Sequence, residues 1–211
     1  MQHATIAPAA RIALLAALLL AAALLQGCAY GIYDDQRLVD TMADDKAMAT
    51  SIKTALMKAD FTGGWAVAVY CYYGNVFLVG EVPKNMQAKA VSIARSYKPR
   101  SVTPHWFTPA KSDTGNFALA TSLRADLIAT KGLSSTRIDT EVNAGRVVLL
   151  GVVQDDAEKQ LAIKVARGVK GVTSVTSYLM LPQKASATQK PGAQGASGEG
   201  GAVEERELPA T

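Results

Sequence analysis

The sequence predicts an α+β fold made of two tandem α-β-β-α-β units, each a three-stranded mixed sheet with two helices on one face. The first observation is a strand pattern that occurs twice, at residues 74–82 (GNVFLVGEV) and 145–153 (GRVVLLGVV). The second is that the spacing of 71 residues persists upstream without a gap, pairing Val67 with Ile138, Leu56 with Leu127 and Ile52 with Leu123. A register held over some thirty positions indicates an internal repeat.

The two ends of the chain differ in composition from the part between them. Residues 12–25 are all Ile, Leu or Ala, whereas residues 183–211 are mostly Gly, Ala, Ser, Gln, Glu and Pro. The tail cannot bury enough apolar area to offset its chain entropy, so we expect it to be disordered. The predicted organisation is a signal peptide (1–27), a tether (28–40), repeat one (41–110), repeat two (111–182) and a disordered tail (183–211).

The first 27 residues read as a targeting segment. Arg11 precedes an apolar run of 14 residues, about 21 Å long as a helix, which is short of the roughly 30 Å of a hydrocarbon core. This length favours a secretory signal over a retained membrane span. The sequence Leu25-Gln26-Gly27-Cys28 resembles a bacterial lipobox, which implies cleavage before a lipid-modified (palmitate-bearing) Cys28. The alternative is an ordinary signal peptide that happens to precede a cysteine. If Cys28 is lipid-modified, Ala29 after it favours the outer membrane, because an Asp at that position favours retention in the inner membrane of Gram-negative bacteria.

Repeat one is predicted from periodicity and turn residues. Asp40, Thr41 or Asp44 is expected to cap a helix whose apolar stripe includes Ile52 and Leu56, and Gly63-Gly64 is expected to end it. Trp65–Tyr70 alternates as a strand, and the glycines Gly74 and Gly80 bound the return strand, with Gly74 supplying the positive φ of the hairpin turn. A second helix follows Pro83. The third strand, 102–107, contains Pro104, which predicts either an edge strand or a broken strand.

Repeat two follows the same plan. Residues 116–129 form a predicted helix with Leu119, Leu123 and Leu127 on its buried side. Residues 137–143 and 147–153 form a predicted hairpin, with Gly145 in the turn and Gly151 in the return strand. Asp155 or Asp156 is expected to cap a helix with Leu161, Ile163, Val165 and Ala166 on its stripe, before a last strand at 172–181.

Both return strands are apolar on both faces, at Val76–Val79 and Val147–Leu150. Continuous apolar runs are typical of strands that are buried on both sides. Two helices cover one face of each sheet, so we expect the sheet of the other repeat to cover the second.

The combined pattern resembles the BON domain. Repeat two carries Gly145, Val147, Leu149, Gly151 and Val153, and then Gly171-Val172; repeat one matches through Val82 but has Pro99–Val102 in place of the Gly-Val element. A lipobox followed by two such units is similar to dual-BON outer-membrane lipoproteins of the DolP type. The resemblance implies a non-enzymatic, periplasm-facing envelope protein that binds anionic phospholipid and supports outer-membrane integrity or osmotic-stress tolerance. A membrane-tethered adaptor that binds an envelope protein or peptidoglycan is the alternative.

The residues that catalysis or metal binding would need are sparse. Downstream of Cys28 there is one histidine, His105, and the only other cysteine, Cys71, lies in a strand-like run that predicts a buried core residue. The pairs Asp44-Asp45 and Asp155-Asp156 sit near helix starts, where capping accounts for them. We therefore expect no enzyme activity, no metal and no cofactor.

The charge balance limits the partners. The net charge of the chain is +4, and the region between Cys28 and the tail carries the same value. This charge suits a weak attraction to an anionic surface. It is too small for a nucleic-acid binder that depends on phosphate contacts.

The lipid contact is predicted on the helix at 116–129. With Phe117 at 0° on a helical wheel, the three buried leucines fall at about 200–280°, whereas Arg124, Ile128 and Lys131 fall at about 340°, 20° and 320°. An aromatic and an aliphatic side chain beside cations are typical of an interfacial helix. One alternative is that Phe117 folds under a neighbouring loop, Ile128 caps the core edge and the cations are merely solvated. Another is that the site lies at Trp106-Phe107.

Overall fold

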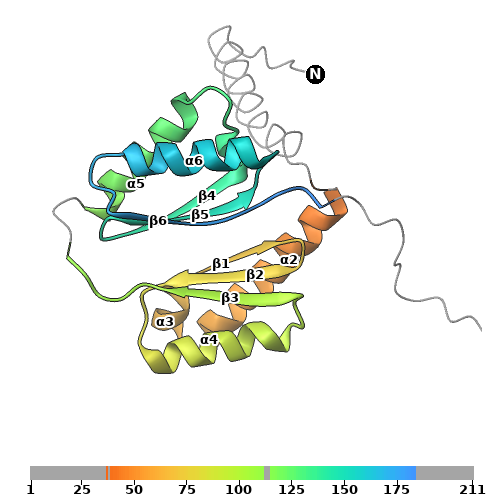
Figure 1. The fold of residues 1–211 in the computed structure, drawn as a ribbon. Coiled ribbons are helices and arrows are strands. Elements are labelled where there is room, and N and C mark those ends of the chain that lie inside the picture. The colour runs from red at the N-terminus through yellow and green to blue at the C-terminus, as the bar shows by residue number, and fades with distance from the viewer. Residues whose placement is uncertain (1–36, 38, 112–114, 184–211) are drawn as a thin grey trace, which may run out of the picture.

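A computed structural model describes residues 37, 39–111 and 115–183 (Figure 1). The predicted signal peptide, Cys28, most of the predicted tether and nearly all of the predicted tail lie outside these residues. Among the residues described, no helix is both long enough and apolar enough to cross a bilayer.

The predicted fold is confirmed: a three-stranded mixed sheet occurs twice, with its helices on one face. Repeat one consists of α2 (Val39–Ala59), α3 (Phe61–Trp65), β1 (Val67–Tyr72), β2 (Asn75–Gly80), α4 (Lys84–Ser96) and β3 (Ser101–Trp106). Repeat two consists of α5 (Asn116–Ala129), the 3-10 turn η1 (Ser135–Arg137), β4 (Ile138–Asn143), β5 (Arg146–Val152), α6 (Asp156–Gly168) and β6 (Ser174–Met180).

Each sheet has its return strand in the centre. β2 pairs antiparallel with β1 and parallel with β3, and β5 pairs in the same way with β4 and β6. Pro104 therefore lies in an edge strand, as predicted, where its missing N–H leaves no partner unsatisfied within the sheet.

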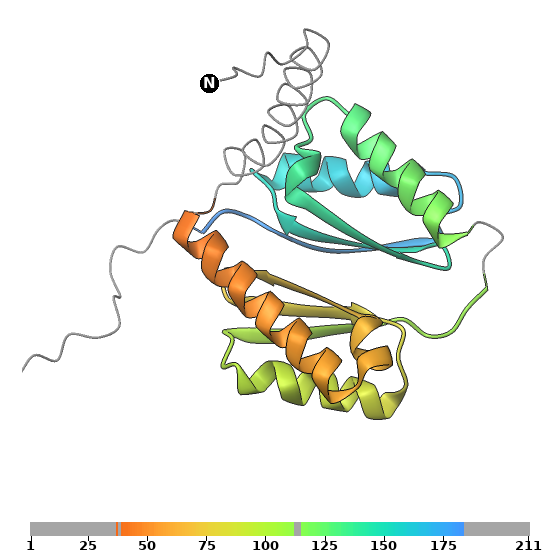
Figure 2. The same cartoon turned by 180° about the vertical axis from the view of Figure 1, so that it is seen from behind.

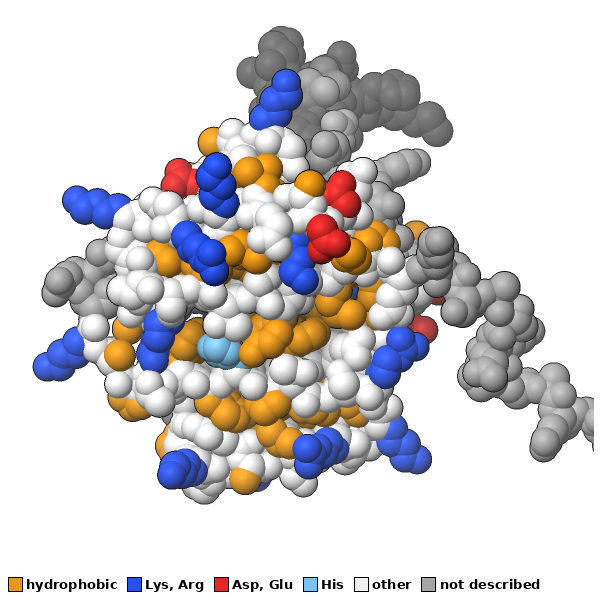
Figure 3. Space-filling model, in the orientation of Figure 1, with side chains coloured by type: hydrophobic (Ala, Val, Ile, Leu, Met, Phe, Trp, Pro, Cys, Tyr) orange, Lys and Arg blue, Asp and Glu red, His pale blue; other side chains and the backbone are white. Residues whose placement is uncertain are grey.

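The two repeats form four layers, helices outside and the two sheets facing one another (Figures 1 and 2). The contact between the sheets, called the seam below, consists of buried side chains from both repeats: Tyr72, Phe77, Val79, Phe107, Val148, Leu150 and Val152. On the face shown in Figure 3, hydrophobic side chains follow the middle of the molecule and Lys and Arg side chains surround them. The seam is the reason that both return strands are apolar on both faces.

The opposite face of each sheet packs against its own helices. Ile52, Leu56 and Leu78 are fully buried in repeat one, and Leu123 and Leu149 in repeat two. The small residues of α4 and α6 lie closest to the sheets: Ala90, Ala94, Ala162 and Ala166. Leu161, Ile163 and Val165, predicted to form the α6 stripe, are only half-buried because the helix turns Ala162 and Ala166 to the sheet.

The hairpin turns require residues that tolerate positive φ. Tyr73 and Gly74 have φ of 54° and 75°, and Ala144 and Gly145 have 47° and 82°, which are the paired positive values of a tight two-residue hairpin. Gly151 is needed for a different reason: a Cβ there would lie 2.0 Å from the carbonyl oxygen of Arg137, at a φ of +133°.

Repeat one departs from prediction at its first helix. The helix already begins at Val39, so Asp40, Thr41 and Asp44 lie within α2 rather than at its N-cap. The helix ends at Ala59, and Gly63-Gly64 belong to the separate helix α3, which Asp60 caps by accepting from the Gly63 N–H. Trp65 ends α3 and is not part of the strand, because the chain turns once more before β1.

Candidate functional site

A groove runs along α5 where repeat two meets the edge of repeat one. Its volume is about 570 Å³. The α5 wall includes Phe117, Arg124 and Ile128, three of the four side chains that the helical wheel placed on one line. The opposite wall comes from β1 and β4, through Tyr70, Asp139 and Thr140.

Phe117 and Ile128 are exposed in the structure. Phe117 is 86% exposed and Ile128 is 64% exposed, so no loop covers the ring and the aliphatic side chain does not close the core edge. The three leucines on the other side of α5 are fully buried or nearly so. The large apolar residues that α5 leaves in solvent are thus the two that flank its groove.

Arg124 has a structural contact that the sequence pattern did not indicate. Its Nη1 donates to the carbonyl oxygens of Ser135 (2.9 Å) and Ile138 (2.8 Å), at the start of the edge strand β4. Lys53, 71 residues earlier, donates from Nζ to the carbonyl oxygen of Val67 (2.6 Å) at the start of β1. Arg124 is therefore an exposed cation that also binds the start of β4 to α5. Replacing it changes the fold as well as the surface charge.

Lys131 does not lie on the wheel position assumed for it. α5 ends at Ala129, and Thr130 has the extended backbone of a C-cap, so Lys131 follows the end of the helix. It is exposed but does not line the groove.

Two acidic side chains of β4, Asp139 in the groove wall and Glu141 two residues later, accept hydrogen bonds from tyrosines of β1. The Tyr72 hydroxyl donates to Oδ2 of Asp139 at 2.5 Å, and the Tyr70 hydroxyl donates to Oε1 of Glu141 at 2.6 Å. Both bonds connect repeat one to repeat two. Burial raises the pKa of Glu141 above its usual value, with the Asp139 charge acting in the same direction against the Tyr70 bond and Lys53.

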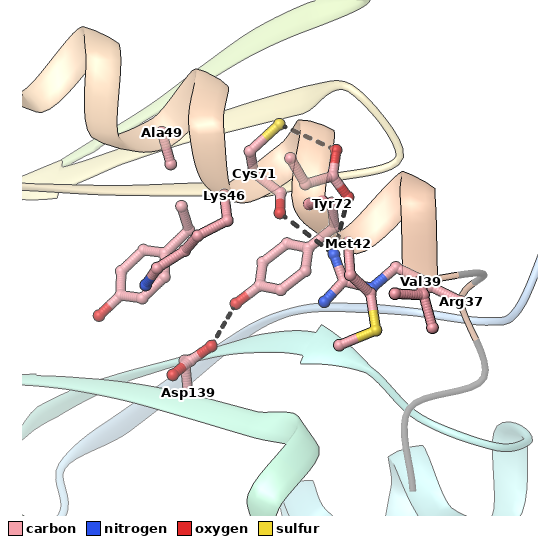
Figure 4. A pocket seen from close by; sticks show the side chains of 11 residues that line it. Arg37, Val39, Met42, Lys46, Ala49, Cys71, Tyr72 and Asp139 are labelled. Atoms are coloured by element: carbon pink, nitrogen blue, oxygen red, sulfur yellow. Dashed lines mark hydrogen bonds and ion pairs between the residues drawn. The ribbon is translucent and has the colours of Figure 1, made fainter. Parts of the chain in front are cut away.

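A second pocket lies between α2 and β1, with a volume of about 400 Å³ (Figure 4). Its inner end is the buried carboxylate of Asp45, which accepts from the N–H groups of Tyr73 and Gly74 at 2.8 Å each and from Arg37 Nη1 at 2.7 Å. In repeat two the equivalent position is Asn116, whose Oδ1 accepts from the Ala144 N–H. Asp45 thus holds the hairpin turn, so it has a structural role as predicted, although not through capping; Asp44 is exposed.

Neither Cys71 nor His105 has the surroundings of a reactive group. Cys71 is buried, as predicted, and burial beside Asp45 raises the pKa of its thiol to about 12, which keeps it protonated. Burial, and secondarily the Arg146 charge, lower the pKa of His105, whose Nδ1 lies 3.1 Å from the Tyr178 hydroxyl across the seam. The described residues contain no cluster of His, Cys, Asp and Glu suited to a metal ion.

The alternative site at Trp106-Phe107 is largely covered. Phe107 is 6% exposed within the seam, and the Arg146 guanidinium lies 5.2 Å from its ring centroid. Trp106 packs against the core of repeat one. The pair does not form an exposed aromatic surface.

The sequence did not reveal the buried ion pair of repeat two. Arg137 Nη2 donates to both carboxylate oxygens of Glu158 at 3.0 Å. Glu158 also accepts from the N–H groups of Ser134 and Gln154. The pair joins η1 to the start of α6. The sequence feature that could have indicated a role for Glu158 is its place three residues after the capping Asp155.

Part of the chain matches a protein-family model. Residues 116–181 match the BON domain. Repeat two therefore carries a BON domain, from the first residue of α5 to one residue past β6. The matched segment ends within repeat two, whereas the same topology recurs in repeat one, where Pro99–Val102 departs from the pattern.

Two proteins are similar to this chain over a length greater than one repeat. One is the 21 kDa hemolysin of Actinobacillus pleuropneumoniae, 26% identical over 158 residues that cover 69% of this chain and 78% of that protein. The other is osmotically-inducible protein Y of Escherichia coli (strain K12), 28% identical over 149 residues that cover 67% and 74%. Among solved structures, the C-terminal domain of CdsD, a structural protein of the type III secretion system of Chlamydia trachomatis, is 13% identical with a TM-score of 0.28, covering 65% of this chain and 66% of that one.

Proposed function

We propose that this chain is a lipid-anchored protein of the outer membrane that faces the periplasm and binds anionic phospholipid through α5 of its BON domain. Its role would be to support envelope integrity, including under osmotic stress. The observation that carries the binding proposal is the exposure of Phe117 and Ile128 on the two ends of one helix face. A soluble domain gains nothing from leaving two large apolar side chains in water, whereas an interfacial helix inserts them among lipid headgroups.

The charge beside these residues supports an anionic surface. Arg124 lies between Phe117 and Ile128 on the groove and stays exposed while its Nη1 clamps β4. Lys131, just beyond the helix, adds a second exposed cation. Basic residues near a negatively charged membrane surface contribute about 1 kcal/mol each, which supplements the apolar insertion. The similarity to osmotically-inducible protein Y supports the proposed role in osmotic stress.

The anchor would be Cys28, outside the described residues. Lipid chains on this residue would hold the folded part near the bilayer, so that α5 needs only modest affinity of its own.

One observation favours the adaptor function instead. Asp139 lines the groove opposite Phe117, and a carboxylate disfavours an anionic headgroup. A protein partner with a cation would tolerate this wall better than phosphate. An adaptor that reads an envelope protein or peptidoglycan through the same groove is therefore the second candidate.

Vesicle binding separates the two functions. The chain from residue 29 onward, which lacks the anchor and the apolar run, should cosediment with vesicles that contain phosphatidylglycerol and not with phosphatidylcholine vesicles. Phe117→Glu should abolish this binding, because the ring no longer inserts and a negative charge replaces it. The fold should be retained, since Phe117 is 86% exposed.

Ser122→Glu is the matched control. Ser122 is exposed on the same helix but does not line the groove, so it adds the same charge without touching the proposed contact. Binding that survives Ser122→Glu and is lost in Phe117→Glu supports the lipid site. Equal binding by the unchanged chain and by Phe117→Glu would refute it, and absence of vesicle binding by the unchanged chain would favour the adaptor.

A further inference from the structure

The short helix α3 has an inverted arrangement of small and large residues. Its sequence is Phe61-Thr62-Gly63-Gly64-Trp65, and the two glycines face the protein. A Cβ at Gly64 would lie 2.4 Å from the backbone carbon of Leu56 in α2, and one at Gly63 would lie 2.9 Å from Cγ of Met86 in α4. The glycines therefore allow α3 to pack against both neighbouring helices.

The aromatic residues of α3 point away from the protein. Phe61 and Trp65 are each 68% exposed, and their rings stack with centroids 6.5 Å apart at an interplanar angle of 28°. The helix thus buries its smallest residues and exposes its largest ones. Packing does not account for two large rings held in solvent, side by side, on a helix fixed by glycine contacts and by the Asp60 cap.

Three lysines come from the helices next to α3. Lys53 Nζ lies 5.8 Å from the Trp65 ring centroid, and Lys89 Nζ donates to the carbonyl oxygen of Ala59 at the junction of α2 and α3. Lys58, in the last turn of α2, is exposed. These three cations outnumber the one carboxylate of α3's own cap, Asp60.

Two further carboxylates lie on the seam side of Trp65. Glu81 and Glu141 line the groove between Trp65 and repeat two. Glu81 accepts from Asn143 Nδ2, and Glu141 accepts from the Tyr70 hydroxyl, so both are engaged in bonds between the repeats. The three lysines are thus matched in number by Asp60, Glu81 and Glu141, but Glu81 and Glu141 lie on the seam side, and among α2, α3, α4 and their junctions the lysines accompany only Asp60 near the exposed rings.

The ring pair and the α5 site lie on related surfaces of the two repeats. Lys53 beside Trp65 and Arg124 beside Phe117 are equivalent positions, each clamping the first residue of an edge strand. In both views α3 and the start of α5 lie at the end of the sheets where the repeats are joined, and Figure 2 shows α2, α3 and α5 on one side of the molecule.

We propose that Phe61 and Trp65 form a second point of contact with an anionic lipid surface, so that repeat one and repeat two bind the same bilayer. Tryptophan suits this position because its ring is apolar and its indole N–H is polar, the combination found at membrane–water interfaces. Lys53, Lys58 and Lys89 face the lipid phosphates. This inference rests on the proposed function, because it takes the bilayer that α5 binds as the occupant of both sites.

Fluorescence quenching tests the contact in the full chain. The chain has two tryptophans, Trp65 and Trp106, so Trp106→Phe leaves Trp65 as the only one. Reconstituted into vesicles of phosphatidylglycerol and phosphatidylethanolamine that carry bromine on their acyl chains, this variant should lose most of its fluorescence and shift its emission to the blue. The matched control is Trp65→Phe, whose remaining Trp106 lies in the other edge strand, β3, and should stay unquenched.

A third variant separates this inference from the proposed function. Trp65→Phe, Trp106→Phe and Phe117→Trp together place the only tryptophan on α5, where it should also be quenched. Quenching at position 117 with Trp65 protected would overturn the second contact and leave the α5 site standing. Protection at both positions would overturn the proposed function itself. Equal quenching of Trp65 and Trp106, or equal quenching of Trp65 in phosphatidylcholine vesicles, would overturn the assignment to an anionic lipid surface.

Discussion

The seam couples the stability of the two repeats, and Leu150→Ala tests this coupling. Leu150 is fully buried in the seam, on the face of β5 turned away from the helices of repeat two. Removing a buried leucine side chain costs about 2–5 kcal/mol, which for a folded part of this size lowers the melting temperature by roughly 5–20 °C. Because the same side chain packs against residues of repeat one, we expect both repeats to lose this stability together.

The position of the tryptophans makes the coupling measurable. Trp65 and Trp106 both lie in repeat one, so tryptophan fluorescence reports on the repeat that does not carry the substitution, whereas circular dichroism reports on both. In urea, the two signals should give one coincident transition that Leu150→Ala shifts to a lower midpoint. Leu123→Ala, in the separate core of repeat two, serves as the control and should shift both signals too if the repeats unfold as one unit. A fluorescence midpoint that neither substitution changes, with a second transition in circular dichroism, would refute the coupling.

Three further predictions concern single positions. Cys28→Ser should release the protein from the membrane fraction, because stable anchoring needs the lipid chains. Cell fractionation measures this, and a variant that is processed normally but stays in the membrane fraction would contradict it. Gly151→Ala should cost more than about 1 kcal/mol in denaturant unfolding, since its Cβ would lie 2.0 Å from the Arg137 carbonyl oxygen at a positive φ; an unchanged midpoint would show that the strand adjusts. Glu141→Gln should raise the free energy of unfolding at neutral pH and make that free energy depend less on pH. Because burial raises the pKa of Glu141 in the folded state, the stability that its protonated form provides is lost as pH rises through that pKa. A glutamine carries no such charge, and its amide oxygen can still accept from the Tyr70 hydroxyl. A variant less stable than the parent at neutral pH would contradict the sign.

The α5 site shows how far a helical pattern leads. The wheel placed Phe117, Arg124 and Ile128 together because the spacing of apolar residues alone sets which face of a helix is buried, and the structure brings these three to one groove. It could not place Lys131, because the end of α5 at Ala129 depends on the turn that follows. Arg124 also bonds carbonyl oxygens at the start of β4, outside its own helix. The periodicity of α5 cannot indicate such contacts.

The sequence by itself determined the repeated α-β-β-α-β plan, the return strands with apolar residues on both faces and the restriction of Pro104 to an edge or broken strand. These follow from local properties: periodicity, turn glycines and the exclusion of proline from paired N–H positions. Even the mutual cover of the two sheets followed from the run at Val147–Leu150, since apolar residues on both faces of a strand require two partners.

Only the tertiary structure decided how the polar groups within the fold are satisfied and what α3 presents. Asp45 and the Arg137–Glu158 pair are buried because each supplies acceptors or charge to specific backbone groups of another element, and such partners are chosen by three-dimensional proximity. The glycines of α3 read as a helix end in the sequence, but they are the face that contacts α2 and α4. Trp65 was predicted as a strand residue but ends α3. Its position depends on how α3 packs against α2 and α4, and a local sequence pattern does not contain that information.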